Sequence, residues 1–429
     1  MRRRVWLIIG IVIGGLIVAV LFWLFDTSAL DRELAALRSQ GLPTNATELN
    51  AFYSVPAGVS DTTELWTAAV SAVAAANIQQ RAANLPFLGS GPTPVPEPGT
   101  EWADLEACRT FLDELDDEFG AILRAADAGG MARYPIDFTR GMYTLMPHVL
   151  EPRQISRLLA LNAHVHAHDG EDQQVLRDVT SIFAVSDSLR GEPVLISQLV
   201  RIATYDLGCQ LGIGMLPHSQ WRDKELENLQ VSIGRANFRQ ETLNAFHGER
   251  ATFLISNAES AGILSRDSNS LQAIELFRIC TDGLNTSWPE AMKKHRGIEK
   301  QMTAMASGML SRLKALTAVH LLPALEVAIL SGASAEARQN CALAILAAHR
   351  YRLQHDELPG SLAEINVLMP GDPDERSVRL QDPFDGLPLR FKSAGGQLLI
   401  YSVGRNMTDD GGILDEEELD GDLVYSIGK

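Results

Sequence analysis

Residues 342–353 read ALAILAAHRYRL, a run of helix-forming residues close to the C-terminal end of the chain. Alanine, leucine and arginine have strong helix propensities, and neither glycine nor proline interrupts the run. Extended in both directions, the pattern predicts one helix from Ser334 to Gln354, with an N-cap at its start. The character of the chain changes just before this helix, at Gly332, so we expect it to open a separate C-terminal part, residues 332–429.

The rest of the C-terminal part has the pattern of short strands and turns. Gly395 and Gly396 lie between two of the expected strands and give a hairpin signal, because a tight two-residue turn needs positive φ angles. A helix followed by a small antiparallel sheet is an α+β arrangement. The three expected strands are Leu387–Lys392, Gln397–Val403 and Leu423–Ile427.

The middle of the chain, residues 101–331, predicts an all-helical domain. Apolar residues recur at helical spacing through Arg153–His168 and again through Glu171–Leu189, and Asp169-Gly170 separates the two segments. This pair loosely resembles the helical hairpins of tetratricopeptide proteins, and we expect hairpins rather than a regular repeat array. The predicted fold class is therefore mainly α with a C-terminal α+β part.

Residues 26–100 connect this domain to the N-terminus. The first of them are expected to form a helical stalk, and Asp61–Ala83 has an alanine-rich helical pattern. Pro86–Pro98 contains five prolines and is expected to be an extended linker or a large loop.

Residues 1–25 have the features of a membrane anchor. Val5–Phe25 is a run of 21 uncharged residues, and as a helix it would span about 31 Å, the thickness of a bilayer core. A cleaved signal peptide is the alternative, but its apolar stretch is usually about 7–15 residues long and ends at small residues, whereas this run ends with the bulky Leu21–Phe25. Arginines at positions 2–4 predict a cytoplasmic N-terminus. Gly10 and Gly14 have the GxxxG spacing that would let two such helices form a homodimer, although glycine is common in membrane helices in any case.

Composition narrows the function. The chain has 37 Lys and Arg against 54 Asp and Glu, and its net charge of −17 repels phosphate backbones, so no nucleic-acid partner is expected. Its four cysteines lie in four different helical segments without a CxxC pair, so they form either one or two disulfides or buried free thiols. A nucleophile elbow, a P-loop, a dinucleotide-binding fingerprint and an HExxH motif are all missing, which argues against an enzyme.

Several motifs of the C-terminal part occur in an order that resembles a known family. They are residues 342–353, the turn Gln354–Pro359 followed by Ser361-Leu362, the segment Asp382–Leu389, the strand end Tyr401–Gly404, and the acidic Asp409-Asp410 and Asp422. Together they resemble the globular domain of the major pseudopilins of type II secretion systems. The resemblance implies a helix with a small antiparallel sheet, a calcium-binding loop, and a location in the inner membrane of a bacterium with the bulk of the chain in the periplasm.

The sequence also departs from that family. In pseudopilins the membrane helix directly precedes the globular domain, whereas here residues 26–331 lie between them. No Gly-Phe-x-x-x-Glu motif, the family's leader-cleavage signal, occurs near the start. The resemblance therefore implies the fold and the loop, and it does not make the chain a pilus subunit.

The acidic loop near the C-terminus is the candidate metal site. Residues 405–429 contain eight acidic side chains, which repel one another unless they are solvated or neutralised by a cation. Calcium accepts six to eight oxygen ligands in flexible geometry, so it suits such a loop better than Mg²⁺ does. The resemblance places Asn406 and Asp422 at the positions of the family's calcium ligands, with Asp410 as a further carboxylate. The alternative is a solvated acidic tail without a metal.

A second candidate metal site, at His164, His166 and His168, is weaker. On a helix, His164 and His168 share a face at the i, i+4 spacing that some zinc sites use. The ordinary alternative is a polar helix end, where histidine suits the negative end of the helix dipole.

The leading hypothesis is a non-enzymatic, membrane-anchored interaction or scaffold protein with a Ca²⁺-stabilised C-terminal domain. It would bind a protein partner in the cell envelope, and residues 5–25 would hold it in the lipid bilayer. One alternative is a component of a type II secretion-like assembly. Another is an extracytoplasmic hydrolase with its site between the helical domain and the acidic loop.

Overall fold

The computed structural model describes residues 14–15, 29–260, 263–305, 309–413 and 421–428. The predicted membrane segment, Val5–Phe25, lies outside these residues except for Gly14 and Gly15, and so does Gly10 of the GxxxG pair. Within the described part of the chain, no helix is both long enough and apolar enough to cross a bilayer. The membrane anchor stays a prediction from the sequence.

Helices dominate the described chain, and one small sheet lies at its C-terminal end, as predicted. Residues 29–39 form the first described helix. The labelled α-helices are α2 (Ala46–Phe52), α3 (Thr63–Ala75), α4 (Ile78–Arg81), α5 (Leu105–Asp113), α6 (Asp116–Ala128), α7 (Glu151–Asp169), α8 (Asp172–Ser188), α9 (Leu195–Gly214), α10 (Asp223–Ile233), α11 (Phe238–Ser260), α12 (Ile263–Thr286), α13 (Trp288–Met305), α14 (Met309–His355), α15 (Leu362–Ile365) and α16 (Pro373–Arg379). Short 3-10 helices are η1 (Phe138–Tyr143), η2 (Pro147–Val149), η3 (Leu216–His218) and η4 (Asn366–Leu368).

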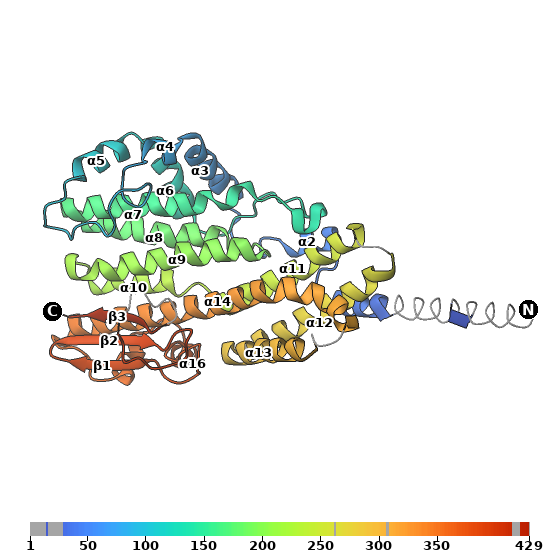
Figure 1. The fold of residues 1–429 in the computed structure, drawn as a ribbon. Coiled ribbons are helices and arrows are strands. Elements are labelled where there is room, and N and C mark those ends of the chain that lie inside the picture. The colour runs from blue at the N-terminus through green and yellow to red at the C-terminus, as the bar shows by residue number, and fades with distance from the viewer. Residues whose placement is uncertain (1–13, 16–28, 261–262, 306–308, 414–420, 429) are drawn as a thin grey trace, which may run out of the picture.

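Helices α3 to α10 form successive layers on one side of α14, and the sheet lies on its other side together with α13 and α16 (Figure 1). The outer group of α3, α5 and α6 packs on α7 and α8, then α8 packs on α9, and α9 packs on α14. The predicted hairpin of residues 153–189 is confirmed, because α7 and α8 pack side by side and Gly170 ends α7 with a φ of 73°. A positive φ at this position is the usual end of a helix before a tight turn.

The central helix α14 is longer than predicted. It begins at Met309, and the predicted start at Ser334 is wrong. Gly332 explains the difference, because a Cβ at this position would lie 2.4 Å from the Trp288 ring and 2.8 Å from Thr242 Oγ1. Gly332 thus marks a close approach of α13 and α11 to α14, and the packing of neighbouring helices outweighs the local signal for a helix start.

The sheet has three antiparallel strands in the order β1 (Arg390–Ala394), β2 (Gln397–Ser402) and β3 (Leu423–Ile427). Ile400 is central, since it pairs with Phe391 of β1 and Tyr425 of β3. The hairpin signal is confirmed, because Gly395 and Gly396 have φ angles of 61° and 81° and join β1 to β2. The first strand starts three residues later than predicted.

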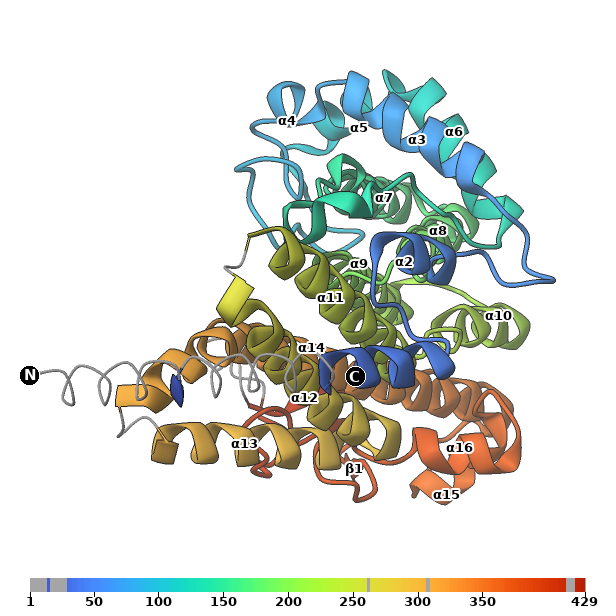
Figure 2. The ribbon, with the colours of Figure 1, turned by 90° about the vertical axis from the view of Figure 1, so that its right-hand side faces the viewer.

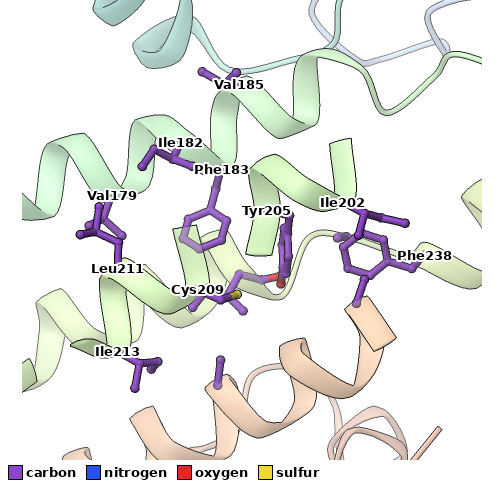
Figure 3. Close-up of a cluster of buried hydrophobic side chains, with 14 of the residues drawn as sticks. Val179, Ile182, Phe183, Val185, Ile202, Tyr205, Cys209, Leu211, Ile213 and Phe238 are labelled. Carbon is purple, nitrogen blue, oxygen red and sulfur yellow. The ribbon is translucent and has the colours of Figure 1, made fainter. Parts of the chain in front are cut away.

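One hydrophobic core runs from the helical layers into the sheet, with buried residues from Trp66 to Ile427. Within it, the rings of Phe183 and Tyr205 lie 5.2 Å apart and those of Tyr205 and Phe238 lie 4.8 Å apart (Figure 3). Residues 341–348 of α14 have no exposed area at all. Their small alanines allow α9 and α10 on one side and β2 and β3 on the other to approach the same helix. Residues 341–348 therefore form the interface between the helical part and the sheet.

Candidate functional site

The loop between β2 and β3 brings together the three residues predicted to bind a metal. The Asn406 amide donates from Nδ2 to Asp410 Oδ2 at 2.8 Å, and its Oδ1 accepts from the Thr408 backbone N–H at 2.8 Å. The Asp422 carboxylate reaches the same loop, because its Oδ2 accepts from the backbone N–H of Gly412, two residues after Asp410, at 2.7 Å. These contacts place Asn406 against Asp410, and Asp422 against Gly412, in one loop.

Asp422 carries the clearest sign of an unsatisfied site. Its Oδ2 accepts from the Gly412 backbone N–H at 2.7 Å, while its Oδ1 is buried and has no hydrogen-bond partner among the described residues. Burial raises the pKa of Asp422 most, and the charges of Asp410 and Asp409 raise it further. A half-buried carboxylate that has one oxygen without a hydrogen-bond donor and is repelled by neighbouring carboxylates would be stabilised by a cation.

The fit to calcium is partial in the described residues. No group of three or more His, Cys, Asp or Glu side chains within them is arranged to hold a metal ion. Asp409 Oδ1 is already hydrogen-bonded, since it accepts from the Tyr401 hydroxyl and the Gly411 backbone N–H, each at 3.0 Å. The other five acidic residues of the loop, between positions 415 and 420, lie outside the described residues. A calcium ion would thus take Asp410 and Asp422 and fill its other positions with amide or backbone carbonyl oxygens.

The buried Asp382 fixes the start of this loop. Its carboxylate accepts from the backbone N–H groups of Phe384 at 3.0 Å and Val403 at 2.9 Å, and from the Ser402 hydroxyl at 2.8 Å. Arg390 donates to the same carboxylate at 3.1 Å and balances its charge. These hydrogen bonds join Asp382 of the Asp-Pro motif to Ser402 and Val403 of the Tyr-Ser-Val-Gly motif. We call this connection the clamp at Asp382, and its role is structural.

The predicted place for a hydrolase site, between the helices and the acidic loop, holds a cavity of about 120 Å³. His295 and Glu326 line it, together with Arg405 and Met407 from the loop. His295 is buried, and its Nε2 faces the Leu322 carbonyl at 3.1 Å. That contact makes Nε2 a donor to the backbone and leaves it no role toward a substrate.

A histidine–carboxylate pair lies elsewhere, at His148 and Glu192. His148 Nε2 is 2.6 Å from Glu192 Oε1, and the ring of Tyr134 stacks on the imidazole at 4.4 Å. The Glu192 side chain has no exposed area. No substrate could reach this pair without rearrangement, so its geometry fits a buried structural contact.

The three histidines of α7 do not form a metal site. His166 Nδ1 lies 3.1 Å from Asp178 Oδ2, whereas the ring of His164 stacks on Phe87 at 5.2 Å. His168 Nε2 lies 3.1 Å from the Pro96 carbonyl. His164 and His168 instead contact the proline-rich loop, and His166 joins α7 to α8 through Asp178.

That loop covers a cavity of about 290 Å³ between residues 87–98, α7, α9 and η3. Most of its lining is apolar: Phe87, Pro94 and Pro96 from the loop, Leu207 and Leu211 from α9, and Met215 directly after α9. Four polar side chains also line it: Glu97, His164, Gln210 and His218. Apolar walls with a few polar groups are the usual composition of a ligand site.

Two features of the cavity indicate more than a packing defect. Burial lowers the pKa of His164 to about 4, so its imidazole is neutral at physiological pH, and its buried Nδ1 has no hydrogen-bond partner among the described residues. Phe87 adopts a φ of 63°, which costs a bulky residue roughly 1–3 kcal/mol. The loop thus holds Phe87 in a strained backbone conformation, with its ring stacked on His164, whose Nδ1 lacks a hydrogen-bond partner among the described residues.

Comparison with protein-family models, with curated proteins and with solved structures finds no match for this chain. Its function is therefore argued from its own geometry. The sequence did not predict the cavity, because the proline-rich segment ends at Pro98, 53 residues before α7 and 97 residues before α9. The only signal was His164, whose partner turned out to be Phe87 rather than a metal.

Proposed function

We propose that this protein is a membrane-anchored scaffold at the outer face of a bacterial inner membrane, and that it binds a partner protein through the cavity under the proline-rich loop. The observation that carries the proposal is this apolar cavity with its unpartnered His164 Nδ1. The predicted anchor at residues 5–25 would hold the cavity in the periplasm, and the role is binding rather than catalysis.

The size and walls of the cavity suit one aromatic side chain. A volume of about 290 Å³ is at the lower limit for drug-sized ligands, which occupy roughly 300–1,000 Å³. Prolines, Phe87 and Met215 provide flat or polarisable contacts, and thioether sulfur packs favourably against aromatic rings. A tryptophan N–H or a tyrosine O–H would find an acceptor in the side chain of Gln210, which lines the cavity.

The packing of α14 supports a scaffold over the alternative of a pilus-like subunit. A pseudopilin assembles through the free part of its long helix, whereas here that part of α14 is packed against α9, α11, α12 and α13 of its own chain. The C-terminal sheet and the helical layers also share one core. The extracytoplasmic part would therefore act as one rigid body that presents the cavity.

Calcium would have a structural role in this scheme. Asp410 and Asp422, with an oxygen from Asn406 or the backbone, would hold the ion and fix the loop between β2 and β3. The ion would supply charge neutralisation there. The chain's own residues, above all the clamp at Asp382, already hold the first part of the loop in place.

Binding of N-acetyl-tryptophanamide to the full chain in detergent tests the proposal. Saturation-transfer NMR should show contact with the indole protons and little contact with N-acetyl-alaninamide. The variant Gly214→Leu should abolish the signal, because Gly214 lines the cavity and a leucine side chain would occupy it. The variant should still fold, since an added Cβ at Gly214 meets no atom within 4 Å. Gly297→Leu is the matched control, since this glycine of α13 also has open space but lies outside the cavity. Equal signals from both variants would overturn the proposal.

A further inference from the structure

A group of large apolar side chains is exposed on and beside the connection between η1 and α7. Met142, Tyr143, Leu145 and Leu150 lie within it, and Ile196 lies beside them at the start of α9; each has between 47% and 73% of its surface exposed. Soluble surfaces rarely carry so many exposed apolar side chains in one place, and such a patch usually marks a contact with a protein or a membrane. We call residues 140–150 the apolar loop.

The apolar loop is held in place from its buried side. Phe138 is almost fully buried, and the Met142 backbone N–H donates to Ser256 Oγ at 2.7 Å. Gly141 has a φ of 55°, and a Cβ there would lie 2.2 Å from the same Ser256 Oγ. The backbone is therefore locked against α11, and the exposed side chains are presented outward by an ordered segment.

The loop lies close to the point where the chain would leave the bilayer. Leu30, in the helix at residues 29–39, packs against Leu254 of α11, and the apolar loop contacts Ser256 of the same helix. These two positions differ by about 3 Å along the axis of α11 but by about 200° around it, so the two segments contact the same turn of α11 on different faces. From Phe25, the end of the predicted membrane segment, to Leu30 is five residues, which span about 8 Å as a helix and at most about 18 Å when extended. Figure 2 looks onto this end of the molecule, with the helix at residues 29–39 and α11 toward the viewer.

We propose that the apolar loop is a second membrane contact, which lies in the interfacial layer of the same bilayer that holds the anchor. Tyrosine is enriched at the interface between lipid tails and water, and Tyr143 is the most exposed of these side chains. Methionine and leucine beside it would enter the upper part of the acyl region, as in other interfacial segments. The contact fixes the tilt of the rigid extracytoplasmic part, and it rests on the anchor of the proposed function.

The test uses the full chain in liposomes with an environment-sensitive NBD probe on Tyr143→Cys. The four native cysteines are buried, so an exposed cysteine can be labelled selectively. Nitroxide-labelled lipids should quench the probe at position 143 at least several-fold more than a probe on Val378→Cys. Val378 is an exposed residue of α16, which lies away from the N-terminal end (Figure 1).

The outcomes separate this inference from the anchor itself. Alkaline carbonate extraction reports the anchor, and quenching reports the loop. If the chain stays in the membrane and position 143 is quenched no more than position 378, the loop contact is wrong and the anchor stands. An emission shift at position 143 that depends on the protein-to-lipid ratio without lipid quenching would mean a contact with a second copy and would also overturn the proposal. Release by carbonate would refute both.

Discussion

The Asp382 carboxylate accepts a hydrogen bond from the Val403 backbone N–H at 2.9 Å. This contact joins the turn before β1 to the end of β2, where the acidic loop begins. Asp382 is almost fully buried, and Arg390 compensates its charge. The position of the candidate calcium loop therefore depends on one carboxylate in the preceding turn.

Replacement of Asp382 should strongly destabilise the protein. Asp382→Ala leaves the buried backbone N–H groups of Phe384 and Val403 without their acceptor and removes one of the two carboxylates that pair with Arg390. Each buried donor left unsatisfied costs about 1–3 kcal/mol, so we expect a total loss of about 2–6 kcal/mol. Urea unfolding of the full chain would measure the change. Asp385→Ala is the control, because Asp385 also pairs with Arg390 but is more exposed, so its loss should cost about 1 kcal/mol. Equal costs for the two variants would mean that the clamp at Asp382 is not special.

Calcium should stabilise the protein selectively. A ligand at about 100 times its Kd stabilises the state that binds it by roughly 2.7 kcal/mol, and Mg²⁺ at the same concentration should give less. Thermal unfolding in EDTA, Ca²⁺ and Mg²⁺ would measure this. Asp422→Asn should remove the calcium effect yet leave the unfolding temperature in EDTA unchanged or higher, because burial and the charges of Asp410 and Asp409 already disfavour an ionised Asp422. No response to millimolar Ca²⁺ would identify the loop as a solvated acidic segment.

Stability should fall with acidification partly through His164. Burial lowers the pKa of His164 to about 4 in the folded state, from an ordinary value near 6.5. Between these values the unfolded chain binds a proton that the folded chain does not, so stability is lost as the pH falls from about 6.5 to 4, by up to about 3 kcal/mol. His164→Phe keeps a ring against Phe87 and should flatten this part of the pH profile. Chemical unfolding at pH 7 and pH 4.5 would measure the difference, and identical slopes for the two proteins would contradict it.

The cysteines should be unreactive in the native protein. All four are buried and free, and burial raises the pKa of Cys108 to about 11 and of Cys280 to about 12. Thiolates are the reactive form, so a thiol reagent at pH 8 should label less than one cysteine per native chain and all four in urea. Resistance of two or more cysteines in urea without reductant would instead indicate disulfides.

Much of the helical fold could be predicted because its signals are local. The hairpin of α7 and α8 follows from apolar spacing and from Gly170, and the β1–β2 hairpin follows from Gly395-Gly396. The true start of α14 could not be predicted, since the helix continues through Gly332. The glycine is there because Trp288 of α13 packs so close that a Cβ would not fit. That contact joins two helices and leaves no mark in the local sequence.

The candidate sites, too, could be predicted from the sequence only in part. Asn406, Asp410 and Asp422 could be chosen because the motifs around them resemble a family, and the structure brings them together. The cavity could not be predicted, because it forms only where the proline-rich loop meets α7 and α9. The sequence showed His164 as one of three histidines, and only packing shows that its nitrogen faces no donor or acceptor.

Photo-crosslinking from the rim of the cavity, in membranes of the host cell, tests the central claim most directly. The exposed Glu97, which lines the cavity, would be replaced by p-benzoylphenylalanine, with the exposed Glu101 outside it as the control position. The account predicts a partner adduct from position 97 that Gly214→Leu abolishes and Gly297→Leu leaves intact. An adduct that survives Gly214→Leu, or the absence of any adduct from position 97, would contradict the assignment of the cavity as the partner site.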